Sequence, residues 1–437
     1  MTICTTEDFR FGSVKGRVVE GGFNGGAVTS DGGILLLREA DRLLGLTAEI
    51  AQEMEDGRQA GKCDHSIVSM LRQRVYGIAL GSEDLNDQDF LRHDLAWQTA
   101  VGAEQPLASS PTLCRFENRA SRRLAWKIHK TLLRTFIKHH KEVPEELVLD
   151  FDATDDPVHG NQEGRFFHGY YGHYCFLPLY VTCGDWVLVS YLRRSNIDPA
   201  KHSLAILSFL VQELRRAWPN VGITLRADSG FCRHWLFSWC ERNDVNYIVG
   251  IAKNNRLLIH AEQLMNRAER RFVRTGGEKQ RLFDEFRYAA DTWHRKRRVI
   301  AKAEYNEHGP NPRFVVTNLR GDPKYLYDTL YCARGDMENR IKQQIEMFAD
   351  RTSCHGWWAN QFRLLLSTLA YTLVHVIRAV GLKGTAFARA QVGTIRLNFL
   401  KLGAVVVRNT RRVRFMFSSA YPRQELFALL LARLQSG

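Results

Sequence analysis

The chain has 437 residues, of which 45% are hydrophobic and 25% charged, as in an ordinary globular protein of two or three domains. Its nine cysteines form no CxxC pair, which disfavours a zinc site and a disulfide framework and indicates buried thiols in a reducing compartment. The N-terminus lacks the apolar core of a signal peptide, and residues 364–380 are too polar for a comfortable membrane span. We therefore expect a cytoplasmic protein with no membrane partner.

Charge is spread unevenly along the chain, whose formal net charge is +14. Residues 1–146 hold 19 Lys/Arg and 21 Asp/Glu, whereas residues 252–437 hold 33 and 15. From residue 351 to the end there are 13 basic residues and one acid, Glu425. Such an excess indicates an anionic partner, and DNA is the natural candidate because phosphate contacts dominate its binding. A basic surface that only aids solubility is the alternative.

Residues 1–143 are predicted to be a mostly helical N-terminal region. After a Gly-rich start with a strand or two, apolar residues recur at helical spacing in 35–44 and 67–80. Ser110-Pro111 is a typical helix start, and residues 121–140 alternate apolar and basic side chains. This region could bind DNA ends or could cap the next domain, and the sequence leaves both open.

The pattern changes to strands at Pro144. Three strands in succession followed by strand–helix alternation predict an α/β fold, a mixed sheet flanked by helices, within residues 144–254. The expected strands are 147–153, 174–181, 186–192, 222–227 and 247–251, and the expected helices are 200–218 and 233–243.

Residues 255–330 are predicted to be a β-rich insertion, because segments such as 283–288 and 298–305 alternate apolar and polar residues. The insertion holds a basic run beside Trp293. Trp293 could stack an unpaired base or could simply pack within a hairpin. The basic residues that could contact DNA are Arg295, Lys296, Arg297 and Arg298.

Residues 331–437 are predicted to complete the sheet domain and to end in a basic helical region. Glu338 lies on an expected helix, with Arg334 and Lys342 four residues to either side. The other face of that helix carries an apolar stripe, Met337, Ile341, Ile345 and Phe348. Taken alone, this pattern is more typical of a solvated helix with ion pairs than of a functional site.

Two further acids, Asp152 and Asp228, end predicted strands and are followed by small residues. Ligands collect at the carboxyl ends of strands in such sheets. If the two strands are neighbours, the carboxylates repel each other unless a cation lies between them. An all-oxygen site of this kind suits Mg²⁺ or Mn²⁺, and Glu338 would be its third acid.

Each of these acids has a competing interpretation. Asp150 points to the same face of its strand as Asp152 and competes with it, while Asp155 and Asp156 could be turn residues. Asp228 could be an Asx-turn residue. The polar loop 159–164 could touch a substrate or form a turn, and the aromatic segment 168–173 is expected to pack on the sheet rim.

The three acids and their surroundings resemble a DDE-type transposase of bacterial insertion sequences, in the branch with a β-rich insertion before the last acid. The matching motifs are Leu149 to Thr154, Leu225 to Phe231, and Tyr331-x2-Arg334-x3-Glu338, with helical sequence at 74–87 also similar. One departure concerns a Lys that often follows the Glu by seven residues. Ile345 stands there, and Lys342 comes three residues earlier.

The resemblance implies an RNase H-like catalytic core that uses two Mg²⁺ ions, with Mn²⁺ as a possible substitute. It also implies double-stranded DNA as partner, both terminal inverted repeats and target, and a homodimer in the synaptic complex. Asp152, Asp228 and Glu338 would hold the metals, and Tyr331, Arg334 and Lys342 would position phosphates. The expected activity is cleavage at element ends and joining of the 3′ ends to target DNA. The alternatives are a nuclease or resolvase that does not join, and a non-catalytic repressor.

Overall fold

The computed structural model describes residues 9–436, which divide into two compact units. The first, here called the helical unit, lies within Met1–Ala120, Glu346–Phe348 and Leu366–Gly437. The second, the sheet unit, consists of Ser121–Ile345 and Ala349–Leu365. The sheet unit begins at Ser121, and its first helix, α7 (Arg122–His139), packs on the sheet; the boundary at residue 143 stays a prediction.

A nine-stranded mixed sheet forms the centre of the sheet unit, in the order β12-β13-β15-β11-β10-β4-β8-β9, with β14 paired to β13. β10 runs parallel to both β4 and β11, and the remaining pairs are antiparallel. This confirms the predicted α/β sheet. The strands are β4 (Glu146–Ala153), β8 (Leu179–Cys183), β9 (Trp186–Tyr191), β10 (Gly222–Ala227), β11 (Asn246–Ile251), β12 (Gln280–Tyr288), β13 (Arg297–Asn306), β14 (Gly309–Pro310) and β15 (Arg313–Thr317).

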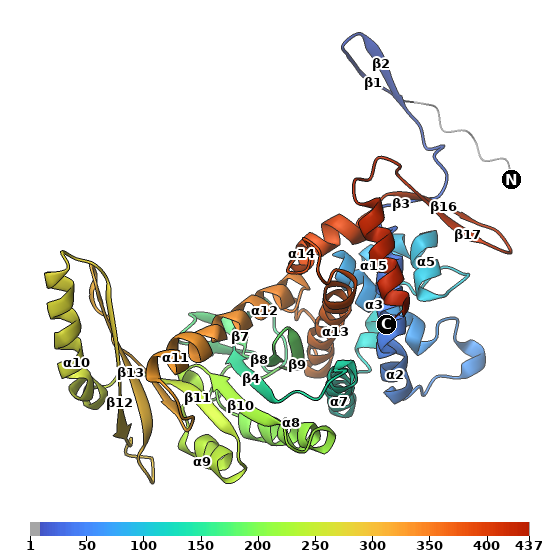
Figure 1. Ribbon diagram of the computed structural model, residues 1–437. Coiled ribbons are helices and arrows are strands. Elements are labelled where there is room, and N and C mark those ends of the chain that lie inside the picture. Colours follow the sequence, from blue (N-terminus) through green and yellow to red (C-terminus); the bar gives the residue numbers. More distant parts are fainter. Residues whose placement is uncertain (1–8, 437) are drawn as a thin grey trace. The chain divides into compact units, whose positions relative to one another are not determined.

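The central strands are apolar along their length because helices cover the sheet. Helices α7, α8 (Ser203–Ala217) and α9 (His234–Arg242) form a row in which each packs on the next, and α7 and α9 also contact β9 and β11 (Figure 1). The buried residues of α8 recur at helical spacing, which explains why this helix was predictable. They are Leu207, Leu210, Val211 and Leu214.

The predicted strand at 174–181 is in fact two strands in different sheets. β7 (His173–Phe176) pairs with β5 (Asp156–Pro157) and β6 (Phe166–His168), whereas β8 belongs to the large sheet. Pro178 lies at the break, and a proline has no N–H to donate to a ladder.

The predicted β-rich insertion begins with a helix, α10 (Asn255–Arg274), which lies along β12 and β13 (Figure 1). Its buried residues Leu257, Ala261, Leu264 and Ala268 have helical spacing, and the Asn254 side chain caps its first turn. The strands that follow do not form a separate layer. β15 pairs with β11, so β12, β13 and β15 extend the core sheet.

Glu338 lies on a helix, as predicted. The chain passes through α11 (Pro323–Tyr325), a π-helix η3 (Leu326–Tyr331) and a 3₁₀ turn η4 (Cys332–Arg334) into α12 (Gly335–Glu346). Met337 and Ile341 are buried, but Ile345 is 43% exposed, and Met347 is buried instead of Phe348. The apolar stripe is therefore shorter than predicted, because Phe348 has a positive φ of 61° and the helix has already ended.

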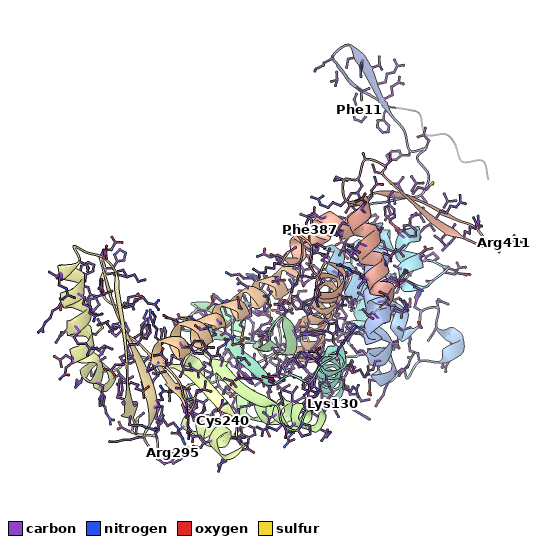
Figure 2. The ribbon with its side chains drawn as sticks, viewed as in Figure 1. Phe11, Lys130, Cys240, Arg295, Phe387 and Arg411 are labelled. Carbon is purple, nitrogen blue, oxygen red and sulfur yellow. The ribbon has the colours of Figure 1, made fainter. Side chains whose placement is uncertain are left out.

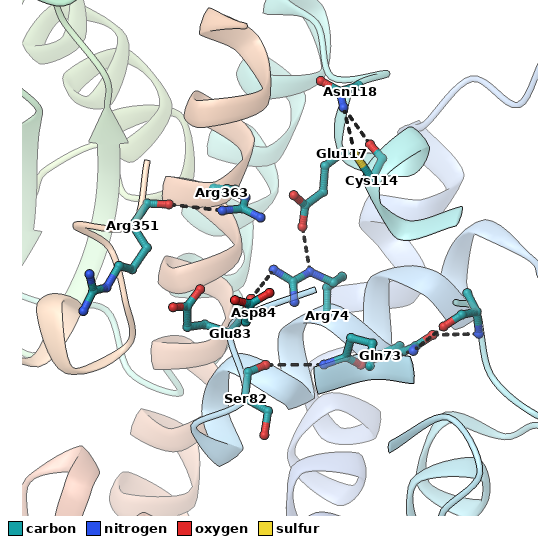
Figure 3. Close-up of polar contacts among 12 residues, drawn as sticks. Gln73, Arg74, Ser82, Glu83, Asp84, Cys114, Glu117, Asn118, Arg351 and Arg363 are labelled. Atoms are coloured by element: carbon teal, nitrogen blue, oxygen red, sulfur yellow. Dashed lines mark hydrogen bonds and ion pairs between the residues drawn. The ribbon is translucent and has the colours of Figure 1, made fainter. Parts of the chain in front are cut away.

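The helical unit has its own buried polar centre. Arg74 on α3 (Ile67–Leu80) donates through Nε to Glu117 Oε1 at 2.6 Å and through Nη2 to the Glu83 carbonyl, and both charged side chains are almost fully buried (Figure 3). The helices that lie wholly in this unit are α1 (Ile34–Leu44), α2 (Leu46–Glu53), η1 (Ala60–Lys62), α3 (Ile67–Leu80), α4 (Asp87–Leu91), α5 (Leu95–Val101), α6 (Ser110–Glu117), η5 (Ile377–Gly381), α14 (Val392–Ile395), η6 (Arg396–Leu400) and α15 (Gln424–Ser436).

The predicted basic helical C-terminal region also contains a hairpin. β16 (Ala404–Arg408) pairs with β17 (Val413–Phe417) and with β3 (Val28–Thr29), and Arg411 lies at the hairpin tip (Figure 2). Near the other end of the chain, β1 (Phe9–Val14) and β2 (Arg17–Gly21) form a separate two-stranded sheet, which confirms strands in the Gly-rich start.

One helical stretch is long and apolar enough to cross a membrane by length and composition. It comprises α13 (Trp357–Val376) and η5 (Ile377–Gly381), and 89% of its most apolar window is buried inside the protein. It is a buried helix, as predicted for residues 364–380. The cysteines within the described residues are free thiols, and Cys4 lies outside the described residues.

Candidate active site

Asp152 and Asp228 meet at one edge of the sheet. Asp152 is near the end of β4, and Asp228 directly follows β10. The two strands are parallel neighbours in which Ala227 pairs with Phe151, so the next residue of each strand lies opposite the other. The neighbouring strands on which the sequence prediction depended are therefore present.

Asp152 lies in surroundings that disfavour its ionised form. Its side chain is 15% exposed, and burial together with the charge of Asp228 raises its pKa to about 7, although Arg334 acts in the opposite direction. Oδ1 accepts from the N–H of Ala153 at 2.8 Å, and Oδ2 accepts from Arg334 Nη1 at 3.2 Å. A cation at this edge would favour the ionised form of Asp152.

Asp228 also closes a turn. Its Oδ1 accepts from the N–H of Gly230 at 2.9 Å and caps the short 3₁₀ helix η2 (Ser229–Phe231). The two interpretations of this residue are thus compatible, because the turn holds the carboxylate in place at the strand end.

Glu338 reaches the first acid through Arg334. The guanidinium donates through Nη2 to Glu338 Oε1 at 2.8 Å and through Nη1 to Asp152. The Glu338 side chain is half-exposed. Within residues 9–436 no group of three or more His, Cys, Asp or Glu side chains is gathered closely enough to hold a metal ion. Arg334 pairs with two of the three acids, Asp152 and Glu338.

Asp150, which competed with Asp152 in the sequence, is occupied by an ion pair. Arg226 on β10 donates to both of its carboxylate oxygens, at 2.5 and 2.7 Å, and both side chains are buried. Arg226 also donates to the Leu330 carbonyl at 2.6 Å, which ties η3 to the sheet just before Arg334. Sequence reasoning missed Arg226, although an arginine inside a buried strand is itself a sign of a paired acid.

Tyr331 lies at the same edge, and its hydroxyl approaches the backbone of Gly250 on β11 closely. A Cβ at Gly250 would lie 2.6 Å from the Tyr331 hydroxyl and 3.0 Å from the Ser229 nitrogen. Tyr331 packs on Tyr327 with ring centroids 5.5 Å apart, and burial raises its pKa. The sequence signal for this contact was a glycine inside a strand, which often marks close approach.

Comparison with known proteins decides the family. The family model described as Transposase DDE domain group 1 matches residues 11–437. The chain belongs to this family. None of the curated proteins matches it. Among solved structures, a piggyBac transposase in a synaptic complex with hairpin DNA is similar, with 10% sequence identity and a TM-score of 0.44 over 84% of this chain and 79% of that chain.

The transposase is a metal-dependent DNA-transposing enzyme, and divalent metal ions are what its family uses. The residues fit such an ion. Asp152 and Asp228 offer only oxygen ligands, and the charge of Asp228 helps to raise the pKa of Asp152. Glu338 would join them once its bond to Arg334 is released.

The arginines of the basic run 294–298 form ion pairs with acids of the fold. Arg297 is 2% exposed and pairs with Glu241 at 2.9 Å. Trp293 is 8% exposed and packs edge-on against Phe237 and Tyr288, each 5.7 Å away. Trp293 therefore packs within the fold, which was one of its two interpretations, and contacts of Trp293 and Arg297 with DNA stay predictions.

The other cations of the run differ in exposure. Arg298 is mostly buried, pairs with Glu285, and donates to two backbone carbonyls, those of Leu319 and Gly321. Arg295 also pairs with Glu241 but stays half-exposed at one end of the extended sheet (Figure 2). Lys296 is exposed. Lys342 is exposed on α12, and its phosphate contact stays a prediction.

The polar loop at 159–164 packs against the segment before α13. The Glu163 N–H donates to the His355 carbonyl at 2.9 Å, and the Trp357 N–H donates back to the Glu163 carboxylate at 3.1 Å. These bonds fix the loop to the segment before α13, and contact of the loop with a substrate stays a prediction. The segment 168–173 does not simply pack on a rim, because Tyr170 in its centre is 86% exposed.

Proposed function

We propose that this transposase cuts phosphodiester bonds at the inverted-repeat ends of its element and joins the freed 3′ ends to target DNA, with Mg²⁺ held by Asp152, Asp228 and Glu338. The observation that carries this proposal is the meeting of Asp152 and Asp228 at adjacent strand ends, where the pKa of Asp152 is raised to about 7. When bound, the metal ions would activate the attacking oxygen and stabilise the leaving oxygen.

Arg334 has two roles in this proposal. In the metal-free arrangement its guanidinium is the counter-ion of Asp152 and Glu338. A metal ion held by these acids would replace the guanidinium as their counter-charge, and the guanidinium would then be available for a bidentate phosphate contact. The Tyr331 hydroxyl, held at the same edge, and Lys342, exposed further along α12, would contact neighbouring phosphates.

The proposal includes double-stranded DNA as partner and a homodimer in the synaptic complex, within the bacterial cytoplasm. Exposed arginines on the β16–β17 hairpin support DNA binding by the basic C-terminal region. They are Arg411, Arg412 and Arg414.

The test is cleavage and strand transfer on short duplexes that carry the element's own ends, with Mg²⁺. We expect Glu338→Gln to lower the cleavage rate roughly a thousandfold, because it removes a metal-binding charge. The thermal midpoint should not fall, since Glu338 is half-exposed. Asp336→Asn, an exposed acid on the same helix, is the matched control and should cleave as wild type does.

The outcomes separate the candidate functions. Wild-type cleavage without joined products would indicate a nuclease or resolvase. Equal rates for wild type and Glu338→Gln would contradict the metal assignment. Binding without any cleavage in Mg²⁺ or Mn²⁺ would indicate a repressor.

A further inference from the structure

A β-hairpin beside the acids carries exposed aromatic rings. Strands β6 and β7 are joined by the turn 169–172, in which Gly172 has a positive φ of 74°. Phe167 is 56% exposed, Tyr170 86% and Tyr174 47%. Large exposed apolar side chains gathered on one element mark an interaction site more often than a fold requirement.

The rings stand in pairs. Phe167 and Tyr174 are cross-strand partners, and their ring centroids lie 5.6 Å apart. At the tip, Tyr170 meets Tyr171 edge-on at 5.1 Å. The guanidinium of Arg165 lies over the Tyr174 ring, 4.5 Å from its centroid. Aromatic faces interleaved with cations are what sites for unpaired nucleic acid use, because every base has a π-face and every nucleotide a phosphate.

The hairpin is fixed to the catalytic end of the sheet. β7 pairs with β5, which begins four residues after Asp152. His173 and Asp155 are hydrogen-bonded at 2.9 Å, and the Tyr171 ring stacks on the His173 ring at 6.1 Å. Burial, followed by the charges of Asp155 and Asp152, raises the pKa of Tyr171 to about 12, so the tip lies within electrostatic reach of the first acid.

We propose that this aromatic hairpin, residues 165–174, is a stacking platform for DNA bases that are unpaired next to the scissile phosphate, with Tyr170 as the outermost contact. The inference rests on the proposed function, since it needs DNA at Asp152. A base inside an intact duplex has both faces covered by its neighbours. An exposed ring beside the cut can therefore stack only on a base that has left the helix.

The hairpin performs the role that one interpretation of the sequence assigned to Trp293, which is buried. Three of its rings, those of Phe167, Tyr170 and Tyr174, are exposed, unlike Trp293, and the hairpin lies in the same connection between β4 and β8 that carries Asp155. A protein partner is the other class of occupant. The flanking arginine and the adjacent acids of a phosphodiester-cleaving site favour DNA.

The experiment compares cleavage of two substrates by the full-length protein. One is an intact duplex carrying the element end, and the other has a mismatch at the base pairs next to the scissile phosphate. We expect Tyr170→Ala to cleave the intact duplex about 10-fold to 100-fold more slowly than wild type, the loss of one stacking contact. The mismatched duplex, whose bases are already unpaired, should restore most of that rate.

Two further variants make the result specific. Tyr170→Phe keeps the ring and should cleave as wild type does. Tyr325→Ala removes a tyrosine that is 59% exposed on α11 and should cleave both substrates normally. Wild-type cleavage of the intact duplex by Tyr170→Ala would overturn the inference, as would an equal loss on both substrates or a loss in Tyr170→Phe. If wild type cleaves neither substrate, the proposed function itself fails.

Discussion

Two parts of the nine-stranded sheet carry many charges, but only one of them pairs most of its charges within the fold. At the catalytic end, Asp152 and Glu338 share one cation, Arg334, and Asp228 adds a further negative charge. In the extension formed by β12, β13 and β15, the arginines of the basic run, Arg295, Arg297 and Arg298, are matched by acids of the fold, Glu241 and Glu285. Both parts look equally charged in the sequence. The fold decides which charge is left available to bind a partner.

The difference is one of energetics. A matched buried pair has exchanged water for its partner, so it contributes to folding and has little left for a ligand. A group of like charges keeps its repulsion until a ligand relieves it, and this lowers the stability of the unliganded protein. We therefore expect the catalytic end to bind a ligand at the expense of folding stability. We expect the paired charges of the extension to stabilise the fold and to bind a ligand weakly.

The largest expected effect tests the matched side of this comparison. Arg297→Ala leaves Glu241 without its buried partner and removes the cation from the Trp293 and Phe237 rings, which lie 5.3 and 5.6 Å from it. We expect the free energy of unfolding in urea to fall by roughly 3–5 kcal/mol. Arg295→Ala removes a half-exposed partner of the same Glu241 and should cost about 1 kcal/mol or less.

If the two variants were equally destabilised, the extension would not depend on the buried pair. Cleavage per folded molecule should be unchanged in both variants, because neither residue contacts Asp152, Asp228 or Glu338. A large loss of cleavage in stable Arg297→Ala would place this arginine in the DNA interface after all.

Much of the catalytic end could be predicted from local sequence. Buried strands leave a strong apolar pattern, and Asp152 and Asp228 stand where those patterns end. Glu338 has helical spacing on both sides. Helix α10 was also within reach, since its apolar residues repeat at helical spacing, but the Gly-Gly pair and the alternating segments after it favoured strands throughout.

The matched pairs could not be predicted, because their partners are distant in the chain. Arg297 and Glu241 are 56 positions apart, and Arg226 and Asp150 are 76 apart. Nothing in either local pattern names the other residue. For the same reason Asp150 and Asp152 could not be separated by sequence. They share a face, and only the position of Arg226 on the neighbouring strand distinguishes them.

The second prediction has an intermediate expected effect and concerns a buried acid without a cationic partner among the described residues, whose titration makes stability depend on pH. Asp156 on β5 is buried, and it accepts one hydrogen bond from Thr352 at 2.8 Å. Burial, with the charges of Asp350 and Asp155, raises its pKa from 3.8 to about 7. The folded state therefore binds this proton more tightly than the unfolded state. The resulting stability is complete below pH 4 and is lost as pH rises through 7.

Asp156→Asn removes that titration and should flatten the pH dependence. We expect the variant to be more stable than wild type at pH 8 by roughly 2–4 kcal/mol, with little difference at pH 4, measured by urea unfolding without metal. Asp284→Asn on β12 replaces an exposed acid and should follow the wild-type curve. A wild-type stability that rises between pH 5 and pH 8, or an unchanged slope in Asp156→Asn, would contradict the assignment.

The smallest effect asks whether any cation of the extension remains available to DNA. Lys296 is exposed, whereas Arg298 is held by Glu285 and by the carbonyls of Leu319 and Gly321. We expect Lys296→Ala to weaken binding of the element-end duplex a few-fold. It should also reduce the slope of log affinity against log salt by about 1, the signature of one lost phosphate contact.

Arg298→Ala should have the opposite profile, with lower unfolding stability and an unchanged salt slope, because its guanidinium is already engaged within the protein. Each variant loses one positive charge, so net charge alone predicts the same slope of log affinity against log salt for both. Different slopes would show that exposure in the fold, not the number of basic residues in the run, sets DNA affinity. Equal slopes would mean that pairing within the fold does not prevent a cation of the extension from contacting DNA.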